Sequence, residues 1–280
     1  MKQQINGNNP IRVLHMAPIR MGGITELVLT LSEKIDSEKV QFDYLTFEDT
    51  FDQASKRAKE AHSTIYRVDL QTVKNPIVRG LKKFFGIIKL VHSEQIKIIH
   101  INSSTPYEVL VAFAAKIGGA KKIIYHSHNS SYYPGQKLVK LSEVFKWFMP
   151  FVITDYLSCS DAAARFMFPK KIVDAENYTV IKNGVDYDKH SFKPEVRTEL
   201  RKKYGLENNF VLGHVGRFNV QKNHEFLMDI FYEVYKHDNS ARLFLVDIKS
   251  AVYSARCKSN KRKSKAIRNR GSCYFSWSIR

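Results

Sequence analysis

The spacing of hydrophobic residues changes repeatedly along the first 185 positions. Short runs rich in Val, Ile, Leu and Tyr alternate with segments in which apolar residues recur every three or four positions, a pattern typical of alternating strands and helices. The predicted strands are Ile11–Pro18, Val40–Phe47, Thr64–Val68, Ile96–Ile101, Lys122–His126, Tyr156–Cys159 and Tyr178–Lys182. The predicted helices are Ile24–Ile35, Gln53–His62, Ile77–His92, Pro106–Ile117, Lys137–Phe148 and Asp161–Phe168.

This alternation predicts an α/β fold, a Rossmann-like doubly wound parallel sheet with helices on both faces. The run Ile96–Ile101 is almost continuously apolar, as expected of a parallel strand that is buried on both faces. Binding sites in such sheets form at the carboxyl ends of the strands. Candidate functional residues are therefore sought where the predicted strands end.

A second, incomplete Rossmann-like domain is predicted after the first. The apolar periodicity lapses over residues 186–205, which contain Pro194 and Gly205 and are interpreted as a linker. Residues 206–246 then begin a new unit: strand Phe210–Gly216, helix Asn223–Tyr235 and strand Ala241–Val246. The first domain is predicted over residues 11–185, after a polar N-terminus at residues 1–10.

Neither strand-like nor helix-like spacing of apolar residues continues after Val246. Residues 247–280 hold ten of the 45 Lys and Arg residues but one of the 27 Asp and Glu residues. This composition predicts a disordered basic tail. The tail accounts for half of the net charge of +18, so the charge does not make the rest of the chain a nucleic-acid-binding protein. Nonspecific nucleic-acid binding by the tail is the alternative for this segment, and no specific nucleic-acid partner is predicted.

Composition and cysteine spacing exclude several classes of protein. Hydrophobic residues make up 44% of the chain, which excludes a wholly disordered protein. The three cysteines show no metal-binding spacing, the N-terminus is polar, and no run of 18 apolar residues occurs. These features predict a cytoplasmic protein in a reducing compartment, without a secretory signal or a membrane span.

Gly22 and Gly23 stand between the first predicted strand and the first helix. Backbone N–H groups at a helix N-terminus favour an anion, and the missing Cβ atoms let a phosphate come close. The surrounding residues do not form GxGxxG, so a nicotinamide or flavin site is not predicted. A tight turn without a ligand explains the pair equally well.

His128 and Asn129 follow the strand Lys122–His126. His126 and His128 are two residues apart and could in principle bind a metal, but no carboxylate or cysteine stands near them in the sequence, so no metal is predicted. His126 is the more structural of the two. A polar loop without a functional role is the alternative for this segment.

Arg217 and Lys222 lie in the loop GRFNVQKN between a predicted strand and the helix for which Asn223 is the expected N-cap. A planar guanidinium and an ammonium five residues apart suit a diphosphate, although two solvated charges explain the pair as well. This loop and Gly22–Gly23 each follow the first strand of a predicted domain. The sequence therefore predicts that they face each other across a cleft.

Five segments together resemble a known family, the GT-B-fold glycosyltransferases of the family-4 type, especially bacterial capsular and exopolysaccharide enzymes. The segments are MGGITELVLTLS, IIYHSHNSS, TDYLSCSDAAARFMF, VIKNGVDYDKHSF and LGHVGRFNVQKNHEFLMDIF. The resemblance covers residues from about Ile11 to Val246. It implies transfer of a sugar from a nucleotide-diphospho-sugar to a polysaccharide or lipid-linked acceptor, with retention at the anomeric carbon. It also implies no cofactor and no obligatory metal.

The resemblance carries roles onto individual residues. Gly22 and Gly23 match the glycine loop near the donor phosphates, and His128 matches the histidine near the transferred sugar. Arg217 and Lys222 match the cations that stabilise the departing diphosphate. The predicted catalytic residues are His128, Arg217 and Lys222; the predicted donor-binding residues are Gly22, Gly23, Asn129, Asn183 and Gly184, of which Asn183 and Gly184 match the hinge segment.

The sequence departs from the family after Val246. The family pattern continues there with a glycine turn, further strand–helix units and a pair of glutamates, whereas here Asp247 begins the basic tail. We expect the donor domain to be truncated at its C-terminus, with residues 247–280 derived from a shifted reading frame or a truncated gene. Little or no transferase turnover is the expected consequence.

Arg79–His92 carries an alternative function without catalysis, as a membrane-surface or anion-binding module. On a helix, Leu81, Phe84, Phe85 and Ile88 share one side and basic residues surround them, an arrangement that suits anionic lipid at the inner face of the cell membrane. A core-packed helix with solvated lysines is the other interpretation.

Overall fold

The computed structural model describes residues 10–17, 19, 22–132, 139–216, 220–247 and 273–277. The chain forms two compact units, Met1–His190 and Ser191–Arg280, which we call unit 1 and unit 2. The division falls within the segment expected to be a linker, five residues beyond the predicted end of the first domain.

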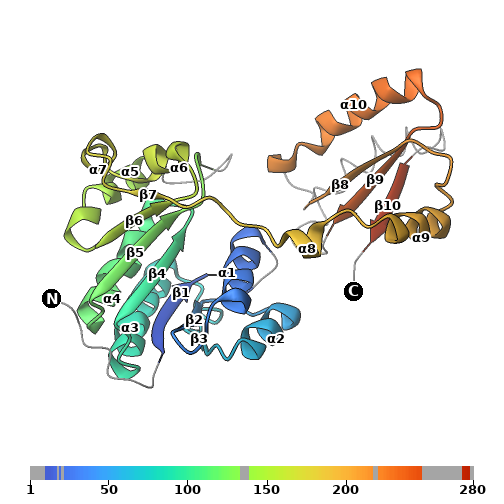
Figure 1. The fold of residues 1–280 in the computed structure, drawn as a ribbon. Coiled ribbons are helices and arrows are strands. Elements are labelled where there is room, and N and C mark those ends of the chain that lie inside the picture. Colours follow the sequence, from blue (N-terminus) through green and yellow to red (C-terminus); the bar gives the residue numbers. More distant parts are fainter. Residues whose placement is uncertain are drawn as a thin grey trace. The chain divides into compact units, whose positions relative to one another are not determined.

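Unit 1 contains a seven-stranded sheet in the order β3-β2-β1-β4-β5-β6-β7, and every adjacent pair is parallel (Figure 1). The strands are β1 (Ile11–Met16), β2 (Val40–Thr46), β3 (Ile65–Arg67), β4 (Ile98–Ser103), β5 (Lys122–Ser127), β6 (Asp155–Ser158) and β7 (Thr179–Val180). The predicted doubly wound fold is confirmed. The strand order reverses between β1 and β4, which makes this pair the topological switch point where ligands bind in such sheets.

Helices cover both faces of this sheet. They are α1 (Gly23–Lys34), α2 (Asp52–Glu60), α3 (Pro76–Ser93), α4 (Val109–Gly118), α5 (Val139–Lys146), α6 (Asp161–Met167), α7 (Lys170–Asp174) and α8 (Tyr187–His190), with the short 3₁₀ helices η1 (Pro106–Glu108) and η2 (Met149–Phe151). Of these, α7, α8 and η2 have no counterpart among the predicted helices. No helix of the described segments is both long enough and apolar enough to cross a bilayer.

Alternate residues of the strands serve two separate cores. Leu14, Ile99 and Ile101 belong to the larger core, which includes residues of α3 and α4. Tyr44 belongs to a second core with residues of α1 and α2, including Val28. Figure 1 shows the two helix pairs on opposite faces of the sheet. Side chains that alternate along a strand point to opposite faces, so each central strand is buried on both sides.

Helix α3 both packs on the core and leaves apolar side chains exposed. The side chain of Asn75 accepts hydrogen bonds from the backbone of Ile77 and Val78 and begins the helix. Ile87 is buried. Phe84 and Ile88, expected on the membrane-facing side, pack against the larger core, so that part of the expectation is wrong. The predicted core-packing interpretation is correct for the second half of the helix.

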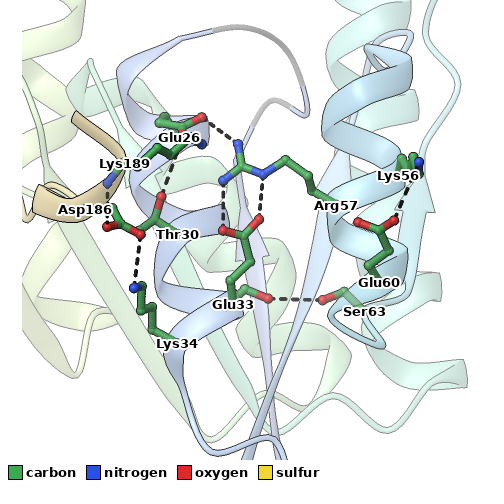
Figure 2. Close-up of polar contacts among 11 residues, drawn as sticks. Glu26, Thr30, Glu33, Lys34, Lys56, Arg57, Glu60, Ser63, Asp186 and Lys189 are labelled. Atoms are coloured by element: carbon green, nitrogen blue, oxygen red, sulfur yellow. Dashed lines mark hydrogen bonds and ion pairs between the residues drawn. The ribbon is translucent and has the colours of Figure 1, made fainter. Parts of the chain in front are cut away.

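Polar contacts hold α1, α2 and α8 together (Figure 2). The Arg57 guanidinium lies 2.6 Å from carboxylate oxygens of both Glu26 and Glu33. Lys189 contacts Glu26 at 3.3 Å, and just before α8 Asp186 contacts Lys34 at 3.0 Å. Two ion pairs therefore link the last residues of unit 1 to α1, the helix that begins after Gly22.

Unit 2 contains a three-stranded parallel sheet in the order β10-β9-β8. Its elements are α9 (Pro194–Tyr204), β8 (Val211–Val215), η3 (Val220–Lys222), α10 (His224–His237), β9 (Arg242–Asp247) and β10 (Cys273–Trp277). Phe231, Leu243 and Leu245 form part of its core. The predicted strand–helix–strand pattern over residues 210–246 is confirmed.

Two expectations about unit 2 differ from the structure. The segment expected as a linker contains α9, which begins with Pro194 and ends before Gly205 in the left-handed conformation, with φ of 63°. Both residues are common helix boundary signals. Val196, Leu200 and Tyr204 also recur every four positions, but all three are exposed and α9 has no buried residues. Within the tail expected to be disordered, Cys273–Trp277 forms β10 beside β9. Residues 248–272 and 278–280 of that tail lie outside the described part of the chain.

Candidate functional site at the switch point of the first sheet

A cavity of about 750 Å³ opens at the carboxyl ends of β1, β2 and β4 in unit 1. Ile24, in the first turn of α1, and Asn102, near the end of β4, both line it. Two cations also line it, Arg79 and Lys83, and Lys83 forms an ion pair with Glu108 at 3.0 Å. The cavity therefore lies where parallel sheets of this kind bind ligands.

Four histidines form a continuous row across this edge of the sheet. His15 pairs with His100 in the register of β1 and β4, and their ring centroids are 4.6 Å apart. The centroids of His100 and His126 are 5.3 Å apart, and those of His126 and His128 are 4.2 Å apart. We call His15, His100, His126 and His128 the histidine row.

Hydrogen bonds connect the row internally and to Asn102. His100 Nε2 lies 3.2 Å from His126 Nδ1. Asn102 contacts two members of the row, with its Oδ1 3.1 Å from His128 Nε2 and its Nδ2 3.4 Å from His15 Nδ1. A single amide thus joins the first strand to the loop after β5.

Burial keeps the histidine row neutral. His15 and His126 are 2% and 5% exposed. Burial, with a smaller effect of neighbouring imidazoles, lowers the pKa of both to about 3; burial lowers the pKa of His128 to about 4 and that of His100 well below its ordinary value. At neutral pH each ring therefore carries one N–H donor and one nitrogen lone pair.

Several buried polar atoms of this edge have no hydrogen-bond partner among the described residues. They are His15 Nε2, His126 Nε2, His128 Nδ1 and Asn129 Nδ2. Buried polar groups are nearly always paired in folded proteins, and exceptions call for an explanation such as a ligand. His128 and Asn129, both predicted from the sequence, are thus brought together with His15 and His126 in a part of the fold suited to binding.

The described residues contain no group of three or more His, Cys, Asp or Glu that could hold a metal ion. The histidine row does not form one, although it brings four imidazoles together. The expectation of a reaction without an obligatory metal or a cofactor stays a prediction.

The structure also bears on the alternative explanation of the glycine pair. Gly22 is the N-cap of α1 and has an extended backbone, with φ of 173°, which any residue can adopt. A Cβ atom placed on Gly22 or Gly23 would meet no atom within 4 Å. Neither a strained turn nor close packing in the described structure therefore requires these glycines. Open space above a helix N-terminus is what a bound phosphate needs.

Lys222 lies at the carboxyl end of β8 in unit 2, as the sequence predicts. A Cβ atom on Gly216, which follows β8, would be 3.4 Å from Lys222 Cε, so the lysine side chain passes over this strand end. Asn223 occupies the N-cap position of α10 with φ of 44°, but its side chain makes no capping hydrogen bond. The expected cap is therefore correct in position and wrong in its contact.

The structure does not bring the remaining predicted site residues together. Arg217 lies outside the described residues, so its pairing with Lys222 stays a prediction, as does the facing of its loop and Gly22–Gly23. Asn183 and Gly184 are exposed and follow β7. Their hinge role also stays a prediction.

Sequence reasoning missed His15, His100 and Asn102. The available signal is a polar residue near the end of a largely apolar strand: His15 in IRVLHM, and His100 and Asn102 at alternate positions in IIHINS. That pattern places the three side chains on one face of the sheet, but only the adjacency of β1 and β4 shows that they meet.

Comparison with known proteins identifies the family. The sequence profile of glycosyltransferase family 4 matches residues 21–189, more than half of the chain. The chain belongs to glycosyltransferase family 4. The matched range contains Gly22, Gly23, most of the cavity lining and three members of the histidine row.

Two relatives of this family-4 chain are similar in sequence. EpsF of Bacillus subtilis (strain 168), provisionally named a glycosyltransferase, is 28% identical over 230 residues, which are 78% of this chain and 57% of EpsF. The UDP-Gal:alpha-D-GlcNAc-diphosphoundecaprenol alpha-1,3-galactosyltransferase of Escherichia coli is 32% identical over 154 residues, 52% of this chain and 38% of that enzyme. The chain thus spans little more than half the length of EpsF and less than half that of the galactosyltransferase.

Solved structures share the fold. Anabaena Alr3699/HepE, crystallised in complex with UDP-glucose, superposes with a TM-score of 0.73 at 18% identity, over 95% of this chain and 68% of HepE. A glycosyltransferase from Rickettsia africae gives a TM-score of 0.66 at 16% identity, over 96% of this chain and 69% of that protein. These likenesses support the GT-B fold class, with its Rossmann-like units, predicted from the sequence.

Proposed function

We propose that this family-4 chain binds a nucleotide-diphospho-sugar and serves in the transfer of its sugar to an acceptor in polysaccharide biosynthesis. The observation that carries the proposal is the cavity at the switch point of unit 1. Its lining includes Ile24, in the first turn of the helix that begins at Gly22–Gly23, and Asn102, whose side chain contacts His128. The donor is proposed to be a UDP-sugar, because the galactosyltransferase relative is named for UDP-Gal and HepE was crystallised with UDP-glucose.

The proposed chemistry follows from the charge that develops during the reaction. Breaking the glycosyl–phosphate bond leaves a nucleoside diphosphate with growing negative charge. Preorganised cations and helix N-termini at that position lower the barrier. Lys222, together with Arg217, is proposed to supply this counter-charge in place of a metal, and the sugar is proposed to keep its anomeric configuration. The acceptor is proposed to be a saccharide or a lipid-linked saccharide.

Titration of the 280-residue chain with UDP tests the donor site. We expect Lys222→Ala to weaken UDP binding at least about 10-fold, the effect of losing one charged hydrogen bond of about 1.5–3 kcal/mol. Lys202→Ala, on the exposed surface of α9 in the same unit, is the matched control and should bind as the parent does. Calorimetry with and without EDTA measures both the affinity and its metal dependence.

The donor proposal would be abandoned if the parent chain does not bind UDP at millimolar concentration, or if both lysine variants lose affinity equally. Turnover is a separate matter, because the chain spans 57% of EpsF. We propose that these 280 residues alone turn over a donor slowly. UDP release from UDP-glucose, compared with a version of the chain extended by the remaining part of EpsF, measures this.

A second proposal concerns association of unit 1 with an anionic membrane surface. Several apolar residues of α3 face away from the core, with Ile77, Leu81 and Phe85 exposed by 73%, 53% and 62%. An apolar cavity of about 520 Å³ lies between α3 and α4, lined by Leu81 and Leu110 among others. The segment from residue 74 to residue 93 carries five Lys and Arg and no acidic residue. Apolar side chains amid cations suit an interface of anionic headgroups.

Liposome flotation tests the membrane proposal. The parent chain should float with vesicles that contain anionic lipid and stay unbound with neutral vesicles. Phe85→Ser should reduce the floated fraction several-fold, because it removes apolar burial worth about 1.5–3 kcal/mol. Leu31→Ser, at an exposed apolar position of α1, should leave it unchanged. Flotation that does not depend on lipid charge would count against this surface.

A further inference from the structure

The side-chain amide of Asn102 has one orientation that satisfies all its neighbours. Asn102 is buried in β4 at the switch point. Its Nδ2 faces the backbone carbonyl oxygens of Met16 and His100, each at 3.5 Å, as well as His15 Nδ1 at 3.4 Å. Carbonyl oxygens can only accept hydrogen bonds. The NH₂ end of the amide must therefore point toward them, and Oδ1 must point the other way.

The orientation of this amide determines which nitrogen of His128 carries the proton. Asn102 Oδ1 lies 3.1 Å from His128 Nε2, and an amide oxygen can only accept. His128 Nε2 must therefore be the protonated, donating nitrogen. Because the buried ring is neutral, Nδ1 then has a free lone pair and no hydrogen.

We infer that Asn102 is a positioning residue that holds His128 in the Nε2–H form, so that its Nδ1 accepts a hydrogen bond from a hydroxyl group of a bound sugar. Nδ1 is buried and has no partner among the described residues, so the site lacks a donor at this point. A sugar hydroxyl supplies one, whereas a phosphate oxygen does not. The sugar part of this inference rests on the proposed function; the proton assignment does not.

Two further contacts hold the ring in place. The backbone N–H of His128 donates to the Ser103 carbonyl oxygen at 3.2 Å. The ring of His126 lies against that of His128, with centroids 4.2 Å apart. These contacts restrain the backbone of His128 and one face of its ring. The hydrogen bond from Nε2 to Asn102 then fixes the remaining rotation of the ring. Asn102 thus acts through His128.

Nitrogen NMR of the full chain labelled with ¹⁵N-histidine tests the proton assignment without any need for turnover. In the parent protein, His128 should show a protonated Nε2, an unprotonated Nδ1 and an Nε2–H proton protected from exchange with water. Asn102→Leu should remove the protection of that proton. Asn102→Asp keeps an oxygen acceptor and should retain it, while the added carboxylate should raise the pKa of His128 by more than one unit.

Ser103→Ala is the matched control. Ser103 is the next residue of β4 and bonds to Thr105 and Tyr125 on the other face of the sheet. This variant removes a buried hydrogen bond in the same strand without touching an imidazole, so it should leave the His128 signals unchanged. If Asn102→Leu fails to fold, a raised His128 pKa in Asn102→Asp, compared with an unchanged pKa in Ser103→Ala, still decides the assignment.

Addition of UDP-glucose and of UDP separates the two parts of the inference. UDP-glucose should shift the Nδ1 resonance of His128, and UDP alone should not. A protonated Nδ1 in the parent protein, or a protected Nε2–H in folded Asn102→Leu, would overturn the positioning role. UDP-glucose that binds without moving the Nδ1 signal would overturn the sugar contact. Absence of any binding would instead be a failure of the proposed function and would leave the proton assignment to be decided by the variants.

Discussion

Lowering the pH from 7.5 to 5 is expected to destabilise unit 1 by several kcal/mol, because the histidine row must be protonated when the chain unfolds. His15, His126 and His128 have pKa values lowered by burial to about 3, 3 and 4 in the folded chain, from an ordinary value of 6.5. The unfolded chain therefore binds protons, from about pH 6.5 downward, that the folded chain excludes.

The direction of the effect follows from these values. Above pH 6.5 the rings are neutral in both states, and the row costs no stability. As the pH falls from 6.5 toward 4 and 3, each ring gains a proton in the unfolded chain alone, and stability is lost. At pH 5 the loss is about 2 kcal/mol for each buried histidine. Summed over the row, this approaches the total stability of about 5–15 kcal/mol that is typical of a domain.

Urea titrations at pH 7.5 and pH 5, followed by circular dichroism, measure the change. His126→Gln removes one titrating group and should shrink the difference between the two pH values by about 2 kcal/mol. His92→Gln, at the exposed end of α3, is the control and should preserve it. Carboxylates in ion pairs contribute in the same pH range, but equally in all three proteins. Equal pH dependence of the two variants would show that the row does not govern acid stability.

The sequence predicts the sheet of unit 1 well because each strand has a strong local signal. The run around Ile99 and Ile101 is apolar throughout, and the structure buries it between two helical layers. By contrast, α9 has no buried face. Its apolar residues Val196, Leu200 and Tyr204 recur every four positions but stand among charged residues, and Pro194 and Gly205 also suit a linker. A sparse apolar pattern in a charged segment is therefore easily missed, whereas a strand that is buried on both faces is not.

The candidate site could be predicted only in part, because it depends on which strands are neighbours. His128 and Asn129 could be proposed from their place after β5. His128 bonds to Asn102 of β4, which also contacts His15 of β1, and these contacts require the register that sets His15 beside His100. Strand order is not encoded in any single segment, so Asn102 reads in the sequence as an ordinary polar residue near the end of a strand.

Replacing Arg12 by Ala is expected to cost about 3 kcal/mol of stability, because it leaves a buried carboxylate without its counter-charge. Asp43 in β2 is fully buried, and the Arg12 guanidinium lies 2.6 Å from its Oδ2. The Arg12 Nε–H donates to the same oxygen at 2.8 Å, and the Thr64 N–H donates to Oδ1 at 2.8 Å. When Arg12 is removed, the Asp43 carboxylate keeps only one of these contacts, the hydrogen bond from the Thr64 N–H.

The partners differ greatly in exposure, and this sets the size of the effect. The Arg12 side chain is 39% exposed, whereas that of Asp43 is 0%, so water can reach the vacated side of the pair and relieve part of the cost. The expected loss therefore lies at the lower end of the 3–5 kcal/mol range found when buried pairs are broken. The exposed Lys39–Asp36 pair is the comparison, and Lys39→Ala should leave stability almost unchanged, because water screens an exposed ion pair.

A second substitution distinguishes charge from packing as the cause. If the penalty of Arg12→Ala arises from an unpaired buried charge, adding Asp43→Asn should recover part of it, because a neutral amide is less costly to bury than a carboxylate. If the penalty arises from the lost arginine side chain alone, the second change should add to it. Urea unfolding of the two single variants and the double variant measures the coupling. Additive losses would show that the unpaired charge of Asp43 is not the source of the penalty.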